Sequence, residues 1–178
     1  KGNAPAGGGS VVAMDARRRP PRLDRGAAGD GDVDESLLQS SQRPIVRLLV
    51  LEDEEDDYDI VEELLARAPD TRFELVWAVS VEAGLRRIAG ERFDACLVDQ
   101  SLPGRSGLDF VRIALQRGFE RPIILMASGG DDELEYRALE AGVAGFLDKE
   151  EFDTGRLDRS IRFATGRSRN TRPLDPPA

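Results

Sequence analysis

Short apolar runs recur along the chain, separated by longer stretches in which apolar residues lie three or four positions apart. The runs are rich in Val, Ile, Leu and Ala and are bounded by polar or turn-forming residues. A short, continuous apolar run of this kind predicts a buried strand. Five strands are predicted, at residues 45–51, 73–78, 95–99, 122–127 and 144–147.

Amphipathic helices are predicted between these strands. Ile60, Val61, Leu64 and Leu65 fall on one face of a helix at residues 55–67. Gly and Pro residues end this helix and those that follow. Four further helices are predicted. The first runs from the N-cap Ser80 to Ile88, and the second contains Leu108, Phe110, Val111 and Ala114 and is closed by Gly118. The third runs from Asp131 to Ala141 and the fourth from about Asp153 to Ala164.

Strands that alternate with helices at this spacing favour right-handed crossovers and a parallel sheet. We therefore expect one doubly wound α/β domain at residues 44–166. Residues 1–43 are rich in Gly, Ala, Pro, Arg and Asp without periodicity, so we expect a disordered or loosely ordered extension there. Residues 167–178 form a Pro- and Arg-containing C-terminal tail.

Polar side chains follow the predicted strands at their carboxyl ends. Glu52 and Asp53 follow the first strand, Asp99 ends the third, Ser128 follows the fourth and Lys149 follows the fifth. In a parallel sheet these ends lie at the same edge. Three carboxylates gathered there repel one another unless protons or a cation neutralise them. Oxygen ligands of this kind suggest Mg²⁺ or Mn²⁺.

The same set of groups suits phosphoryl transfer to a carboxylate. An aspartate can act as a nucleophile and form an acyl phosphate, and a lysine can stabilise charge on the transferring group. The donor is expected to come from outside, because neither a Walker loop nor a kinase Gly-rich loop is present. Taken singly, each residue has a simpler interpretation. Glu52 and Asp53 could belong to a solvated first helical turn, Asp99 could cap the following turn, and Lys149 could be a surface lysine. Their joint placement favours a site.

Composition excludes several other function classes. Histidine is absent, which rules out a Ser-His-Asp triad, a Cys-His pair and most zinc sites. Residues 44–178 hold 28 acidic side chains against 18 basic ones, which argues against direct nucleic-acid binding. The single cysteine, Cys96, is expected to be a small buried residue. No signal peptide or membrane-length apolar run is visible, so we expect a cytoplasmic protein without membrane contact.

Residues 44–166 resemble the receiver domain of bacterial two-component response regulators. The matching features are Leu-Val-Leu-Glu52-Asp53, Phe-Asp-Ala-Cys-Leu-Val-Asp99 with Leu102-Pro103-Gly104 and Gly107, Pro122-Ile-Ile-Leu-Met, and Glu140-Ala-Gly-Val-Ala-Gly-Phe146-Leu-Asp-Lys149. The resemblance implies a flavodoxin-like (βα)5 fold with strand order 2-1-3-4-5, which puts the first and third strands side by side. It also implies a phosphoprotein of a phosphorelay rather than an enzyme.

The resemblance further assigns roles to individual residues. Asp99 matches the phosphoacceptor that becomes 4-aspartylphosphate, and Lys149 the residue that pairs with the phosphoryl group. Asp53 would bind Mg²⁺ directly, while Glu52 would ligate it or orient a bound water. The backbone carbonyl of Ser101 would be a third protein ligand. The aromatic switch position of the family is occupied by Phe146.

Two positions depart from the family pattern. Ala127 stands where the family has the switch Thr or Ser, and a hydroxyl appears only one position later, at Ser128. Either Ser128 reaches the site through a shifted loop, or the hydroxyl coupling is missing. Glu150 stands after Lys149 in place of a common proline, so we expect an ordinary trans bond there.

The leading hypothesis is a receiver phosphorylated on Asp99 by a partner histidine kinase or phosphotransfer protein. No output domain fits after residue 166, so output is expected through contact with a downstream protein. The face of the fourth helix, fifth strand and fifth helix is the expected surface, and it is also a candidate for homodimer contact. Ala127 motivates the alternative of a phosphorylation-independent interaction module. A carboxylate-dependent phosphohydrolase is disfavoured, because no second acid/base is visible.

Overall fold

The computed structural model describes residues 43–129 and 132–170, with side chains through residue 166. Apart from Arg43, the predicted N-terminal extension lies outside the described residues, as does the tail beyond Asn170. The elements, in chain order, are β1 (Ile45–Leu51), α2 (Glu55–Ala66), β2 (Arg72–Ala78), α3 (Val81–Gly90), β3 (Ala95–Asp99), α4 (Gly107–Gln116), β4 (Ile123–Ala127), α5 (Asp132–Ala141), β5 (Gly145–Asp148), the 3₁₀ turn η1 (Lys149–Glu151) and α6 (Thr154–Asn170).

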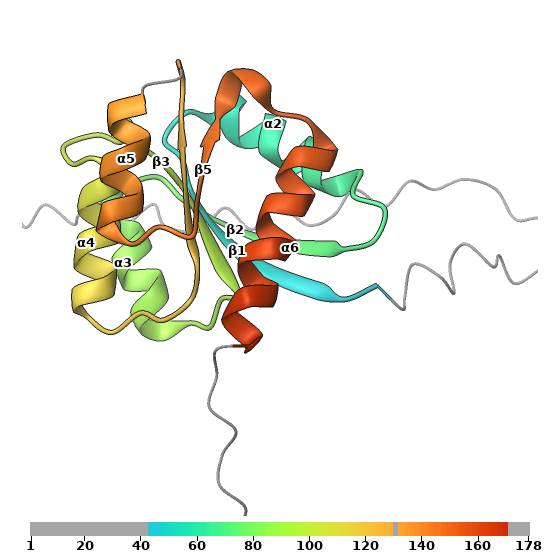
Figure 1. The fold of residues 1–178 in the computed structure, drawn as a ribbon, viewed down its shortest axis with the longest axis horizontal. Coiled ribbons are helices and arrows are strands. Elements are labelled where there is room, and N and C mark those ends of the chain that lie inside the picture. The colour runs from blue at the N-terminus through green and yellow to red at the C-terminus, as the bar shows by residue number, and fades with distance from the viewer. Residues whose placement is uncertain (1–42, 130–131, 171–178) are drawn as a thin grey trace, which may run out of the picture. The chain divides into compact units, whose positions relative to one another are not determined.

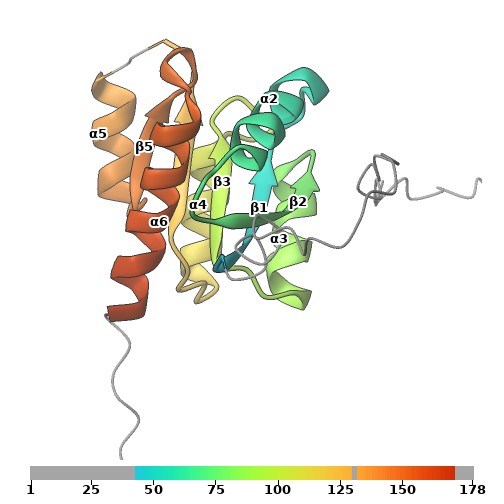
Figure 2. The same cartoon turned by 90° about the vertical axis from the view of Figure 1, so that its right-hand side faces the viewer.

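The five strands form one parallel sheet in the order β2-β1-β3-β4-β5, which confirms the predicted fold. Helices α3, α4 and α5 cover one face of the sheet, and α2 and α6 cover the other (Figures 1 and 2). Because β1 and β3 are neighbours whose connections leave on opposite faces, their carboxyl ends form the topological switch point of the sheet.

Side chains on both faces of the central strands are buried, as their continuous apolar sequences predict. Leu49 and Leu51 of β1 pack with α3, α4 and α5, whereas Leu48 and Val50 pack with α2 and α6. Cys96 of β3 is fully buried, and this burial raises the pKa of its thiol. The two apolar layers hold the central strands rigidly, so the residues at the strand ends have fixed positions.

Local signals in the sequence account for most helix ends. The hydroxyl of Ser80 accepts a hydrogen bond from the backbone N–H of Ala83 at 3.2 Å, as predicted for an N-cap. Gly118 and Gly142 follow α4 and α5 with positive φ angles of 80° and 97°, a backbone conformation that glycine adopts without strain. Helix α6 continues to Asn170, past the expected end near Ala164, because its last turns contain no helix-stopping proline.

Within the described part of the chain, no helix is both long enough and apolar enough to cross a membrane. No cis peptide bond occurs in the same residues, so the bond between Lys149 and Glu150 is trans, as expected.

Gly107, the first residue of α4, lies directly against the strand that carries Asp99. A Cβ atom at this position would overlap with the backbone carbonyl oxygen of Asp99 and would lie 2.9 Å from Cδ1 of Leu125. The absence of a side chain therefore lets α4 begin immediately beside the end of β3. Backbone contact of this kind leaves little room to relax.

We expect Gly107→Ala to lower the free energy of unfolding by about 1–3 kcal/mol, because the added methyl group forces β3 and α4 apart. Urea denaturation followed by circular dichroism measures this change. Gly90→Ala is the matched control, since a Cβ there meets no atom within 4 Å; it should leave stability unchanged or raise it by at most about 1 kcal/mol. Equal midpoints for wild type and Gly107→Ala would contradict the expectation.

Candidate functional site

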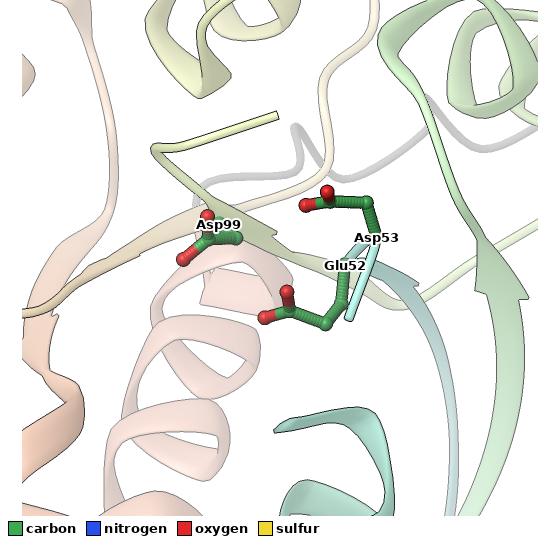
Figure 3. A group of neighbouring side chains, drawn as sticks. All are labelled: Glu52, Asp53 and Asp99. Atoms are coloured by element: carbon green, nitrogen blue, oxygen red, sulfur yellow. The ribbon is translucent and has the colours of Figure 1, made fainter. Parts of the chain in front are cut away.

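Three carboxylates meet at the carboxyl edge of the sheet. Glu52 and Asp53 follow β1 directly, and Asp99 is the last residue of β3 (Figure 3). One oxygen of each group lies within 4.8 Å of the others. Glu52 is 1% exposed and Asp99 3% exposed, so water screens their mutual repulsion only weakly. The structure therefore brings together the acidic residues that the sequence placed at one edge.

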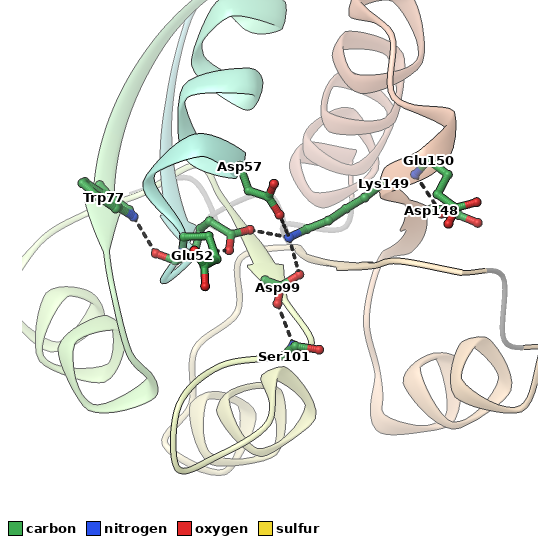
Figure 4. Close-up of polar contacts among 9 residues, drawn as sticks. Glu52, Asp57, Trp77, Asp99, Ser101, Asp148, Lys149 and Glu150 are labelled. Carbon is green, nitrogen blue, oxygen red and sulfur yellow. Dashed lines mark hydrogen bonds and ion pairs between the residues drawn. The ribbon is translucent and has the colours of Figure 1, made fainter.

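The ammonium group of Lys149 offsets this negative charge. Its Nζ atom lies 2.6 Å from Oε2 of Glu52, 2.7 Å from Oδ2 of Asp57 and 2.8 Å from Oδ1 of Asp99 (Figure 4). An ammonium group has three donors, and each of the three carboxylates is close enough to accept one. Lys149, predicted from its place after the fifth strand, thus joins the ends of β1 and β3 to the start of α2.

The charges in the site shift one another's proton affinities. Burial is the largest influence on Glu52 and raises the pKa of its carboxyl group; Lys149 opposes this shift, and Asp99 adds to it. Burial acts to lower the pKa of Lys149, but hydrogen bonds with Asp57, Asp99 and Glu52 outweigh burial and raise it. Lys149 is therefore firmly protonated at neutral pH, whereas the charge on Glu52 is unfavourable in the folded chain.

Both oxygens of Asp99 have partners in the fold. Oδ1 faces Lys149, and Oδ2 accepts a hydrogen bond of 2.6 Å from the backbone N–H of Ser101 (Figure 4). Ser101 lies in the turn after β3, so the chain holds the carboxylate from its own following residues. The position of the Ser101 backbone beside Asp99 is consistent with the predicted ligand role of its carbonyl, which stays a prediction.

The three predicted switch residues, Ala127, Ser128 and Phe146, take no part in the polar contacts of Asp99 and Lys149 described above. Ala127 ends β4, is 7% exposed, and pairs in register with Asp148 of β5. Ser128 is exposed, and within the described residues its hydroxyl forms no hydrogen bond. Phe146 of β5 is partly buried against the apolar layer beneath α3, α4 and α5. The role of Ser128 in place of a hydroxyl at position 127 therefore stays a prediction.

Asp57 is a member of the site that sequence reasoning did not identify. It belongs to the acidic run after β1, which has the ordinary interpretation of a solvated first helical turn. Its carboxylate nevertheless contacts Lys149, 92 residues away. No signal in the sequence distinguished Asp57 from Glu55 and Asp56, the other acidic residues in the first turn of α2.

The donor set suits a hard divalent cation. Glu52, Asp53 and Asp99 all offer carboxylate oxygens close to one another, and Mg²⁺ and Mn²⁺ prefer such ligands. Lys149 and the buried carboxylates together form a concentrated charge cluster at the switch point of a doubly wound sheet. A parallel α/β sheet with this cluster at its carboxyl edge defines a signalling domain of the receiver class.

Sequence comparison places the chain in that class. Residues 48–162 match the profile of the response regulator receiver domain, and the chain belongs to this family of two-component systems. It is 35% identical over 119 residues to the response regulator protein PilR of Pseudomonas aeruginosa, covering 66% of this chain and 26% of PilR. It is 31% identical over 123 residues to the transcriptional regulatory protein DltR of Streptococcus agalactiae, covering 69% and 53%.

Solved structures agree on the fold. A receiver domain from Clostridium thermocellum has a TM-score of 0.64 at 22% identity, covering 71% of this chain and 99% of that one. A CheY-like receiver domain from Methanospirillum hungatei has a TM-score of 0.62 at 20% identity, covering 71% and 98%. The chain thus corresponds to whole isolated receiver domains but to only a quarter to about half of the two curated regulators above.

We expect Glu52→Gln to raise the free energy of unfolding at pH 7 without divalent cations by about 0.5–2 kcal/mol. Because the folded-state pKa of Glu52 lies above 4.5, the folded chain binds more protons than the unfolded chain just above that pH. The stability of the wild type therefore falls as pH rises through this window. The side-chain amide of Glu52→Gln does not ionise, so the variant does not lose stability in this way. Urea denaturation in EDTA between pH 4.5 and pH 7 should show the two proteins converging on acidification. A less stable variant at pH 7 would refute this expectation.

We expect Asp57→Asn to increase the reactivity of Lys149 toward acetic anhydride several-fold at pH 8. Asp57 helps to raise the pKa of Lys149, so its loss increases the fraction of free amine. Lys1 is the only other lysine and serves as the internal reference in peptide mass spectrometry. Asp56→Asn, an exposed neighbour, is the matched control and should change nothing. Unchanged Lys149 reactivity in Asp57→Asn would show that this ion pair is not maintained in solution.

Proposed function

We propose that this chain is a phosphoacceptor receiver that takes a phosphoryl group on Asp99. One observation carries the proposal: the carboxylate of Asp99 lies 2.8 Å from the ammonium of Lys149 and beside the acidic pair Glu52 and Asp53. A nucleophile, a cation and a set of oxygen ligands are thereby assembled at one edge of the sheet, which favours phosphoryl transfer over a turn-capping role for Asp99.

In the proposed reaction a carboxylate oxygen of Asp99 forms a bond to phosphorus while the bond from phosphorus to the donor breaks. The donor keeps the electron pair of the broken bond, and Asp99 becomes an acyl phosphate. Lys149 stays near enough to neutralise charge on the phosphoryl oxygens. The N–H of Ser101 holds the other carboxylate oxygen and so restricts rotation of the nucleophile.

A divalent cation, Mg²⁺ or Mn²⁺, completes the proposal. Glu52, Asp53 and Asp99 would hold it, and the Ser101 carbonyl is the further ligand that the family resemblance implies. When bound, the cation supplies positive charge that relieves the repulsion among the carboxylates and stabilises the transferring phosphoryl group.

The proposed donor is a partner histidine kinase or histidine phosphotransfer protein, because the chain contains neither histidine nor a nucleotide-binding loop. The proposed output is contact with a downstream protein at the face formed by α5, β5 and α6. Large apolar side chains are exposed on both helices, with Tyr136 61%, Leu139 51% and Phe163 67% exposed, and exposed apolar side chains suit a protein interface.

Ala127 bears on how phosphorylation is detected rather than on whether it occurs. The groups proposed to accept and neutralise the phosphoryl group, Asp99 and Lys149, are in contact. A hydroxyl at position 127 belongs to the switch in the family resemblance, not to the nucleophile or its ligands. We therefore propose phosphorylation of Asp99 rather than the phosphorylation-independent interaction module.

We expect incubation with acetyl phosphate and Mg²⁺ to add the mass of one phosphoryl group to the intact protein. Asp99→Asn and excess EDTA should each abolish the gain, because they remove the nucleophile and the cation. Asp56→Asn, which removes an exposed carboxylate in the first turn of α2, should be phosphorylated like the wild type. Intact-mass spectrometry measures all four samples. A wild type that gains no phosphoryl group, or an Asp99→Asn variant that still gains one, would refute the proposed function.

A further inference from the structure

The single tryptophan of the chain, Trp77, lies next to the acidic site rather than in the centre of the core. It is the penultimate residue of β2 and is only partly buried. Its indole Nε1–H donates a hydrogen bond of 2.6 Å to the backbone carbonyl oxygen of Glu52 (Figure 4). This contact reaches from β2 across the sheet edge to the first residue after β1.

The carbonyl of Glu52 depends on this donor because the backbone ladder ends here. The N–H of Glu52 still donates to the carbonyl of Ala78 at 3.0 Å. In a parallel pair, the carbonyl of Glu52 would next accept from the N–H of residue 80. Ser80, however, is already the N-cap of α3, where the chain turns away. Glu52 is 1% exposed, so the indole supplies a donor that solvent cannot easily replace.

The other side of the same indole contacts helix α2. Trp77 and Tyr58 stack with ring centroids 4.7 Å apart and an angle of 17° between the planes. Tyr58 belongs to the first turns of α2, where its N–H donates to the carbonyl of Glu54. Trp77 therefore holds both ends of the acidic segment from Glu52 to Tyr58, one end by a hydrogen bond and the other by ring stacking.

Fixing the carbonyl of Glu52 also fixes Asp53. This carbonyl belongs to the planar peptide unit that joins the two residues, so a hydrogen bond to it sets the plane from which the Asp53 side chain departs. Without such a restraint, repulsion among three carboxylates within 4.8 Å of one another would favour rotation of the acidic pair away from Asp99.

We propose that Trp77 is a positioning residue that holds Glu52 and Asp53 in the arrangement that binds a divalent cation. The inference rests on the proposed function, because it requires the metal site at these carboxylates. Trp77 acts through the backbone and touches neither the cation nor the phosphoryl group. Its indole emission reports directly on the loop that carries the ligands.

The test compares Mg²⁺ affinity by isothermal titration calorimetry in wild type and Trp77→Phe. Phe keeps a ring that can stack on Tyr58 but has no N–H for the Glu52 carbonyl. We expect affinity to fall about 2- to 10-fold, the range for loss of one hydrogen bond. Phe73→Leu, at the opposite end of β2, is the matched control: it should lower stability and leave Mg²⁺ affinity unchanged. Circular dichroism verifies that every protein is folded at the temperature used.

A spectroscopic measurement completes the test. Tryptophan emission of the wild type should change and saturate as Mg²⁺ is added, and the change should vanish in Asp53→Asn. Equal Mg²⁺ affinity in wild type and Trp77→Phe would overturn the role of Trp77, as would an equal loss in Phe73→Leu. If Asp99 were still phosphorylated in those cases, the proposed function would stand. A wild type that binds no Mg²⁺ would overturn the metal site and the inference together.

Discussion

Electrostatic repulsion among carboxylates at one sheet edge is the constraint on which the site depends. Two of them, Glu52 and Asp99, are almost fully buried, where repulsion between like charges is strong and water cannot relieve it. Lys149 is the countercharge that the fold provides, and its ammonium contacts both. Removal of such a partner leaves charges buried and uncompensated, which destabilises a protein far more than the loss of an exposed ion pair.

The sheet order explains why a lysine can provide this countercharge. Strands β1 and β3 are neighbours, whereas β5 is separated from β3 by β4. A residue at the start of η1 must therefore extend over the end of β4 to reach Asp99. Lysine has a long, flexible stem and a compact charge, which suits this span. The buried apolar layers on both sides of the sheet hold the strand ends that set the distance.

Sequence patterns predicted the features that depend on neighbouring residues in the chain or on strands buried along their whole length. The five strands followed from uninterrupted apolar runs, and the site followed from polar residues at their carboxyl ends. Contacts that depend on how the strands pair and how the helices dock on the sheet were not predictable in this way. Asp57 resembles any acidic residue in a first helical turn, and Trp77 resembles any strand residue. Only the pairing of Leu51 with Ala78 and the docking of α2 bring both side chains to the site.

The polar contacts of Asp99 also show which segments of the chain a change in its charge would affect first. One contact leads to the backbone of Ser101 in the turn before α4, and the other leads to Lys149 at the start of η1. Ala127 offers no hydroxyl, and Ser128 is exposed, so β4 supplies no side-chain hydrogen bond to this carboxylate. Lys149 is continuous in sequence with β5 on one side and precedes α6 on the other. A change in the charge of Asp99 would therefore act first on two segments: the turn before α4, through the N–H of Ser101, and the start of η1, between β5 and α6, through Lys149.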